Sequence, residues 1–178
     1  QGWWSKTQPI EGGQYFRFSV LRRTTDVANP RRSCMVRLLW QDGEGRLVPQ
    51  DAPLSTPLLT GKTVQAEAEH PVDGPTDANG WTEVAGVYYV PKAAKQAAIE
   101  LHLQWAPGGQ VAWRNAKLEP CAEPASRKVR LAAVHYAPTG GKTPAGNCRL
   151  FAPLVAEAAR QRADLVVLPE TLTQTGLD

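Results

Sequence analysis

The carboxylate of Glu170 is the side chain of this sequence that is best placed for acid–base chemistry. It follows an apolar run at 165–168, which predicts a strand that is buried on both faces of a sheet. Pro169 has no N–H to donate, so pairing should stop there and leave Glu170 just past the strand's carboxyl end. Open α/β sheets carry ligands and catalytic groups at that edge. The alternative is an ordinary solvated loop acid, and spacing alone does not separate the two.

The residues before Glu170 predict one β-α-β unit. A first strand is expected at 128–134, residues 144–162 have mostly helical spacing, and 165–168 supply the second strand. Pro153 interrupts the helical stretch, where a proline costs about 3 kcal/mol. We expect Pro153 either in the first turn of the helix or after a short first turn that kinks into the main helix.

This segment resembles the start of the carbon–nitrogen hydrolase (nitrilase) superfamily. The matching features are the strand at 129–134, Asn147 before the helix, the Ala-rich helix end at 156–159, and Ala-Asp-Leu-Val-Val-Leu-Pro-Glu at 163–170. The resemblance implies that Glu170 is the general base of a Glu-Lys-Cys triad. In such a triad a cysteine thiolate attacks an amide or nitrile carbon, and a lysine stabilises the developing negative charge.

The lysine and the nucleophilic cysteine of that triad come much later in the family's chains, and this sequence matches neither. Cys148 falls near the expected helix start without a positioned base, so we expect a packing thiol. This chain alone should therefore have no amidase activity. The chain starts at Gln1 without Met and stops at Asp178 soon after a strand, so we expect a fragment of a longer protein. That protein would act on a small amide or nitrile and could form a homo-oligomer.

Tryptophan is the second residue type with chemistry to offer, because indoles present large flat faces with one polar N–H. Trp3 and Trp4 are adjacent, so in a strand they face opposite sides, and one of them should be exposed. They are the candidate ligand-binding residues, with a glycan as the ligand. The remaining tryptophans favour core or edge packing, and they are Trp40, Trp81, Trp105 and Trp113.

Two loops imitate cofactor or metal sites without meeting their requirements. Gly-Gly-Lys-Thr at 140–143 lacks the earlier glycine of a phosphate-binding loop, since Tyr136 occupies that position. The segment 73–80 resembles a calcium loop, but Pro75 and Gly86 occupy two of the ligand positions, so turn chemistry explains it better. The sequence therefore predicts no cofactor and no metal.

Composition and charge narrow the class further. The 178 residues carry a net charge of +3 and no Lys/Arg run longer than two, which disfavours nucleic acid as a partner. No apolar run is long enough for a membrane span. Cys34 is expected in the core, and a Cys34–Cys121 disulfide is compatible with the sequence but not implied. The cellular compartment is left open, export from a bacterium being one option.

Residues 1–120 combine short alternating runs with turn signals, which predicts a β-sandwich. The connection 50–80 is expected to be irregular, with at most a short strand near Val64. The expected strands lie at 15–22, 34–40, 81–90, 97–105 and 111–118.

The order of motifs in this part resembles the jelly-roll sandwiches of carbohydrate-binding modules and galactose-binding-like domains. The motifs are Gly-Gly-x-Tyr-x-Phe-x-Phe, Trp-x-Asp-x-x-Gly, Trp-Thr-Glu-Val, Glu-Leu-His-Leu and a last strand into Leu-Glu-Pro. Related sandwiches often carry a structural calcium on an acidic pair in the last strand. Arg114 and Asn115 stand there in this chain, which argues against such a metal.

The sequence thus predicts a mainly β chain in two domains. A jelly-roll β-sandwich at 1–120 and a Pro-rich linker at 121–127 precede the first β-α-β unit of a nitrilase-like α-β-β-α domain at 128–178. The favoured hypothesis is the N-terminal portion of a carbon–nitrogen hydrolase with an accessory sandwich. The alternative is a non-catalytic module that binds a carbohydrate or another partner.

Overall fold

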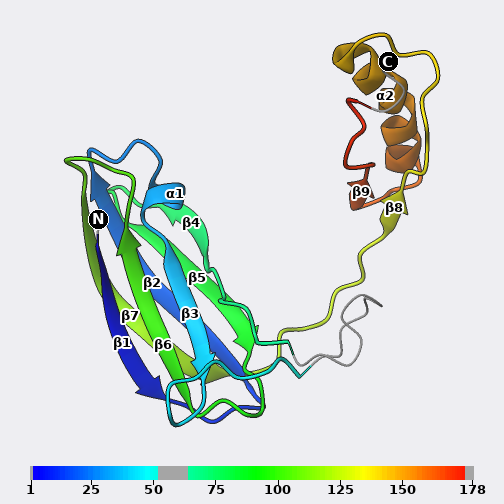
Figure 1. The fold of residues 1–178 in the computed structure, drawn as a ribbon. Helices are drawn as coiled ribbons and strands as arrows, with labels where there is room; N and C mark the ends of the chain where they lie inside the picture. The colour runs from blue at the N-terminus through cyan, green and yellow to red at the C-terminus, as the bar shows by residue number, and fades with distance from the viewer. Residues whose placement is uncertain (1, 52–63, 175–178) are drawn as a thin grey trace. The chain divides into compact units, whose positions relative to one another are not determined.

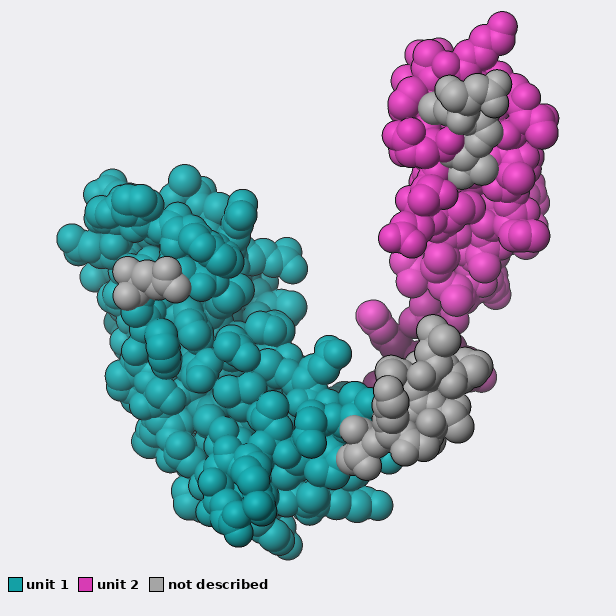
Figure 2. Space-filling view, in the orientation of Figure 1, with its two compact units in different colours: residues 1–124 teal, residues 125–178 magenta. Residues whose placement is uncertain are grey.

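The computed structural model describes residues 2–51 and 64–174 (Figure 1). The chain divides into two compact units, Gln1–Pro124 and Ala125–Asp178 (Figure 2). The first is an antiparallel β-sandwich and the second a small β-α-β unit. The predicted fold class, a mainly β chain with a sandwich followed by a β-α-β unit, is confirmed.

Two antiparallel sheets form the sandwich. The three-stranded sheet has the order β1 (Gly2–Pro9), β6 (Gln96–Leu103), β3 (Val36–Gln41). The four-stranded sheet has the order β4 (Val72–Thr76), β5 (Thr82–Tyr89), β2 (Tyr15–Thr25), β7 (Gln110–Cys121). A short helix, α1 (Pro30–Ser33), precedes β3.

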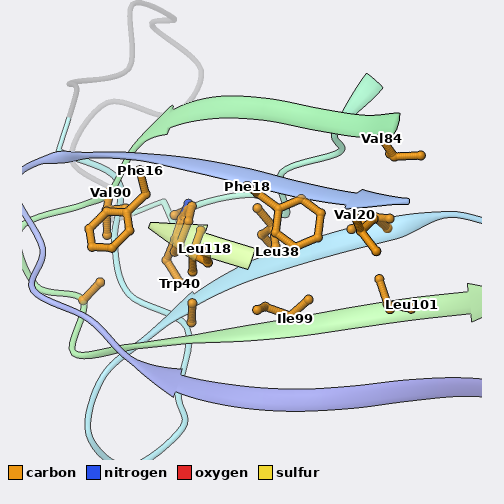
Figure 3. Packing of buried hydrophobic residues seen from close by; sticks show 14 of the residues in the cluster. Phe16, Phe18, Val20, Leu38, Trp40, Val84, Val90, Ile99, Leu101 and Leu118 are labelled. Carbon is orange, nitrogen blue, oxygen red and sulfur yellow. The ribbon is translucent and has the colours of Figure 1, made fainter. Parts of the chain in front are cut away.

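The core lies between the two sheets (Figure 3). Alternate residues of β2, namely Phe16, Phe18 and Val20, point into it and are buried. The facing sheet contributes buried residues of β3 and β6, which include Leu38, Trp40, Ile99 and Leu101. This period-two burial is what the alternating sequence pattern predicted, and each large aliphatic or aromatic side chain so buried contributes about 1.5–3 kcal/mol.

The connection between β3 and β5 is more regular than its sequence indicated. It contains β4, which pairs with β5 through a register shift between Asp73 and Thr76. The sequence did not predict this strand, because it contains Gly74 and Pro75, and both residue types are poor strand formers away from edges and bulges. Near Val64, where at most a short strand was expected, Gln65 makes an isolated bridge to Pro49. Residues 52–63 of the connection lie outside the described part of the chain.

The tryptophans divide between core and surface. Trp40 and Trp81 are buried and Trp113 packs partly against the core, as predicted. The prediction for Trp105 is wrong, because β6 already ends at Leu103 and Trp105 lies in the following turn with φ of 52°. Its indole is exposed there.

The cysteines differ in part from expectation. Cys34 is buried as predicted, but all three cysteines are free thiols, so Cys34 and Cys121 form no disulfide. Cys148 is exposed on a helix, so its expected packing role is wrong. β7 continues to Cys121, and the two compact units divide after Pro124.

The second unit contains β8 (Leu131–Ala133), α2 (Pro144–Arg160) and β9 (Leu165–Val167). β8 and β9 pair in parallel, with Leu131 opposite Leu165. The Gly-Gly-Lys-Thr segment is the entry to α2: Thr143 is the N-cap and its Oγ1 accepts a hydrogen bond from Gly146 N at 3.0 Å.

Pro153 lies in the interior of α2. The first sequence alternative, a place in the first turn, is therefore wrong, since the helix runs continuously from Pro144 to Arg160. A kink at Pro153 stays a prediction. Phe151 and Ala158, on either side of Pro153 in the sequence, are buried, and the Tyr136 ring packs edge-on against Phe151 with centroids 5.4 Å apart. This tertiary packing offsets the cost of an interior proline.

Candidate functional site

Glu170 lies past the carboxyl end of β9, as its sequence position predicts. It begins a turn in which Leu172 N donates to Pro169 O at 3.2 Å, and its side chain is exposed. Among the residues that the structure describes, none forms a hydrogen bond or ion pair with the Glu170 carboxylate. Its proposed role as a general base stays a prediction.

The strand that leads to Glu170 is not buried on both faces, and that prediction is wrong. Leu165 is 54% exposed and Val167 is 47% exposed. The parallel register places Leu131 on the same face, and it is exposed too. The opposite face, with Ala132 and Val166, is only partly buried. In the described part of this unit the sheet has two strands, so one apolar face has nothing packed on it.

A second candidate site lies on the sandwich, at the edge that β1 and β7 share (Figure 1). Gln8 Nε2 donates to Leu118 O at 3.0 Å and links the two sheets at one point of this edge. Further along, a cleft of about 430 Å³ opens. We call it the edge cleft, and its lining residues are Trp4, Leu101, Trp113, Arg114, Asn115 and Ala116.

The register of β1 on β6 explains how Trp4 reaches the edge cleft. Trp4 pairs with Leu101, a buried core residue, so both side chains lie on the inner face of the sheet. Because β1 is an edge strand, Trp4 is nevertheless 48% exposed. Its neighbour Trp3 pairs with His102 on the outer face and is 62% exposed. The two tryptophans face opposite sides as predicted, but both are exposed rather than one.

Trp3 offers an aromatic surface whose polar surroundings are already engaged. Its ring stacks on His102 at a centroid distance of 5.6 Å. His102 Nε2 lies 2.9 Å from Glu100 Oε2, which also lies 3.5 Å from Arg37 Nη1. Among described residues, Trp3 therefore has no unengaged charged group beside it in this network, which makes its surface less suited to a polar ligand than the edge cleft.

A β-bulge shapes the other wall of the edge cleft. Ser19 pairs with Lys117 whereas Leu21 pairs with Arg114, so β7 carries one residue more than β2 here. Asn115 in this bulge has φ of 57°, a left-handed conformation that asparagine tolerates better than most residues. Bulges commonly occur beside binding and active sites, where they redirect a side chain.

The edge cleft combines aromatic surfaces with hydrogen-bonding groups. Two indoles provide flat apolar surfaces, Asn115 provides an amide, and Arg114 forms part of the wall while its guanidinium lies over Trp81. Its volume falls in the range of small-molecule pockets. The lining includes no carboxylate, histidine, thiol or hydroxyl that could serve as an acid, base or nucleophile. Sequence reasoning found Trp4 but missed the contributions of Arg114 and Asn115, because these depend on the bulge.

The clearest pKa shift lies elsewhere on the sandwich. Burial raises the pKa of Tyr88 to about 12, and the nearby Glu69 carboxylate adds to the shift. Burial also raises the pKa of Glu69 itself. Glu69 lines a separate cavity of about 600 Å³ together with Trp40 and Asp51.

Neither a membrane-spanning helix nor a metal-binding cluster is present among the described residues. No helix there is long and apolar enough to cross a membrane. In the same part of the chain, no three or more His, Cys, Asp or Glu side chains gather where they could hold a metal ion.

Comparisons with known proteins identify no family. No protein-family model and no curated protein sequence matches the chain. Two solved structures match, and neither is described as a carbon–nitrogen hydrolase. The first is the enzymatically active domain of bacteriophage CBA120 tailspike protein 4, at 20% identity and a TM-score of 0.45, covering 67% of this chain and 14% of that one.

The second is the Clostridium thermocellum N-terminal endo-1,4-β-D-xylanase 10B, comprising its CBM22-1 and GH10 modules in complex with xylohexaose. The identity is 10% and the TM-score 0.37, and the match covers 91% of this chain and 28% of that chain. The chain thus spans less than a third of the length of either structure. These likenesses are too distant to carry a functional argument.

Proposed function

We propose that residues 1–124 form a non-catalytic carbohydrate-binding module with its ligand in the edge cleft. The observation that carries the proposal is the exposed Trp4 indole at a cleft whose lining includes Trp113 and two hydrogen-bonding side chains. A sugar ring has apolar C–H faces and a rim of hydroxyls. Such a ring fits a site with flat aromatic walls and a hydrogen-bonding amide such as that of Asn115.

Trp3 provides a matched control for a test of this site. It is adjacent to Trp4 on the same strand and similarly exposed, but it lies on the opposite face of the sheet. We expect Trp4→Ala to weaken glycan binding about tenfold or more, as removal of an aromatic hot spot does. Trp3→Ala should leave the affinity unchanged. Isothermal titration with soluble oligosaccharides measures both, and thermal melts confirm that each variant is folded.

The opposite result would move or remove the site. A loss on Trp3→Ala alone would place the ligand on the outer face of the three-stranded sheet. Affinity that survives both substitutions would show that neither tryptophan contributes. If no glycan binds the intact chain, the proposal fails.

The β-α-β unit favours a second candidate function for a longer protein that contains this chain. That candidate is a carbon–nitrogen hydrolase of amidase or nitrilase type, with a small amide or nitrile as substrate and Glu170 as the general base. Its support is the parallel pairing of β8 and β9 and the position of Glu170 past the end of β9. The residue pattern of 128–170 adds to this support.

Glu170 and Asp164 allow a test of the hydrolase candidate with an internal control. Glu170→Gln in the full-length protein should lower turnover of a simple amide about 10²–10⁴-fold. The melting temperature should not change, since Glu170 makes no hydrogen bond or ion pair to other described residues. Asp164 Oδ2 accepts a hydrogen bond from Arg130 N at 2.8 Å, so Asp164→Asn should lower the melting temperature and spare turnover. Wild-type turnover by Glu170→Gln would rule the carboxylate out as the base.

A further inference from the structure

Two arginines on the outer face of the four-stranded sheet contact one indole. The guanidinium carbon of Arg114 lies 3.9 Å from the centroid of the Trp81 ring, and that of Arg23 lies 4.7 Å from it. We call Arg23, Arg114 and Trp81 the Arg–Trp cluster. Cation–π attraction holds each guanidinium against the ring, which limits the freedom of side chains that are otherwise flexible.

The charges of this cluster are not neutralised within the described chain. Other arginines of the two sheets pair with acids, in the pairs Arg17–Glu83, Arg22–Asp73 and Arg37–Glu100. Among described residues, Arg23 and Arg114 have no acidic partner. Two like charges held at one ring repel each other, so an anion bound beside them would relieve the repulsion. Guanidinium groups also present paired N–H donors that match carboxylate and sulfate oxygens.

Arg114 belongs both to the lining of the edge cleft and to the Arg–Trp cluster, and its guanidinium lies over Trp81 on the outer face of the four-stranded sheet. The opposite wall adds a further positive charge. Lys6 pairs with the buried Ile99, so its side chain lies on the same face of the sheet as that of Trp4, two residues before it. Lys6 is exposed and has no ion pair among the described residues. The cleft is thus flanked by cations on both strands, and its lining contains no acid.

We propose that the ligand of the edge cleft is an acidic glycan, a chain of pyranose rings that carry carboxylate or sulfate groups. One ring stacks on Trp4, and the glycan continues past the β7 edge, where an anionic group on a following ring accepts hydrogen bonds from the Arg114 guanidinium. Arg23 and Lys6 strengthen the attraction. This inference rests on the proposed function and specifies its substrate class.

The test compares polymers that differ only in charge. Polygalacturonate is set against its methyl ester, and dextran sulfate against dextran, in isothermal titrations with the intact chain. We expect the charged member of at least one pair to bind about tenfold or more tightly at low salt, since charge-assisted hydrogen bonds to a guanidinium are worth that much. The difference should narrow as salt screens the exposed charges. The two pairs distinguish a carboxylate ligand from a sulfate ligand.

Substitutions locate the anion. Arg114→Gln and Arg23→Gln should each weaken binding of the acidic polymer several-fold and leave the neutral polymer unaffected, whereas Arg114→Lys should retain part of the preference. Arg46→Gln is the matched control, because it removes the same charge from an exposed arginine that pairs with Asp42 and Glu44 in a turn. It should not change the affinity. Thermal melts check that each variant is folded.

Four results would overturn the inference. Equal binding of charged and neutral polymers would leave the module intact but remove the acidic specificity. Unchanged affinity of Arg114→Gln would remove the assigned anion site. Binding of a thymidine oligonucleotide as tightly as either acidic polymer would identify a nucleic-acid surface instead of a glycan site. Failure of all four polymers to bind would count against the module itself.

Discussion

Asp73→Ala should strongly destabilise the sandwich, because it leaves the buried Arg22 guanidinium without its ionic partner. The Arg22 side chain is 4% exposed. Its Nη1 and Nη2 donate to the two carboxylate oxygens of Asp73 at 3.1 Å and 2.5 Å, and Nη1 also donates to Cys34 O at 3.2 Å. Without the carboxylate, a buried guanidinium keeps a single neutral acceptor. Removing one partner of such a pair costs about 3–5 kcal/mol.

The expected shift in melting temperature follows from the size of the unit. For a unit of 124 residues, each kcal/mol corresponds to about 4 °C, so Asp73→Ala should lower the melting temperature by about 12–20 °C. The control is Glu83→Ala, which breaks the Arg17–Glu83 pair. Both side chains of that pair are about half exposed and lie 2.8 Å apart. An exposed pair contributes at most about 1 kcal/mol, so the control should shift the melting temperature by about 4 °C or less.

Tryptophan fluorescence is a suitable assay, since all six tryptophans lie within residues 1–124 and report on the sandwich alone. The double variant Arg22→Met with Asp73→Ala should recover most of the lost stability, because an apolar side chain of similar length can replace a buried ion pair. If Asp73→Ala destabilises no more than Glu83→Ala, the claim of a buried charge is refuted. A double variant that is less stable than Asp73→Ala would refute the pairing argument.

Three further predictions concern the tyrosines, a glycine and the division of the chain. Spectrophotometric titration should show one of the four tyrosines ionising near pH 12, and Tyr88→Phe should remove this step. Because the pKa of Tyr88 is raised in the folded state, the neutral Tyr88 side chain contributes its full stability below pH 10, and this contribution is lost as the pH rises towards 12. Gly86→Ala should cost about 1–3 kcal/mol in urea melts because a Cβ there would overlap Tyr88 Oη, while Gly43→Ala, where a Cβ meets no atom within 4 Å, should be nearly neutral. Trypsin should cleave within 122–130, which carries no strand or helix, and leave a folded sandwich that keeps its tryptophan fluorescence; loss of that fluorescence signal on cleavage would contradict independent folding.

The alternating strands were the part of the fold most open to prediction. Phe16, Phe18 and Val20 recur at the period of a half-buried strand, and this pattern can be recognised without knowledge of the neighbouring strands. β4 and α1 were not predicted, because their local sequences show no such periodic pattern. Gly74 and Pro75 are tolerated in β4 because it is an edge strand with a bulge, and that position depends on pairing that the sequence does not display.

The candidate site was predictable only in its aromatic half. Adjacent tryptophans near the start of the chain indicated an exposed indole, and Trp4 is exposed. Arg114 and Asn115 join the edge cleft because β7 bulges between its pairs with Ser19 and Leu21, which is a property of register. For Trp105, the strand pattern was extended one step too far: the chain turns after Leu103, and the alternation no longer applies.

Two doublets, pairs of identical neighbouring residues, show why the exposure and the contacts of a side chain could not be predicted from residue type alone. Arg22 and Arg23 are neighbours on β2, as Trp3 and Trp4 are on β1, and the pleat sends the members of each doublet to opposite faces. Arg22 turns inward and is neutralised by Asp73, whereas Arg23 turns outward and its guanidinium lies over Trp81. The two members of a doublet have the same residue type and lie on opposite faces of a sheet, so each serves as a control for the other. Stability should depend on Arg22 and not on Arg23, and ligand affinity should depend on Arg23 and Trp4 and not on Trp3.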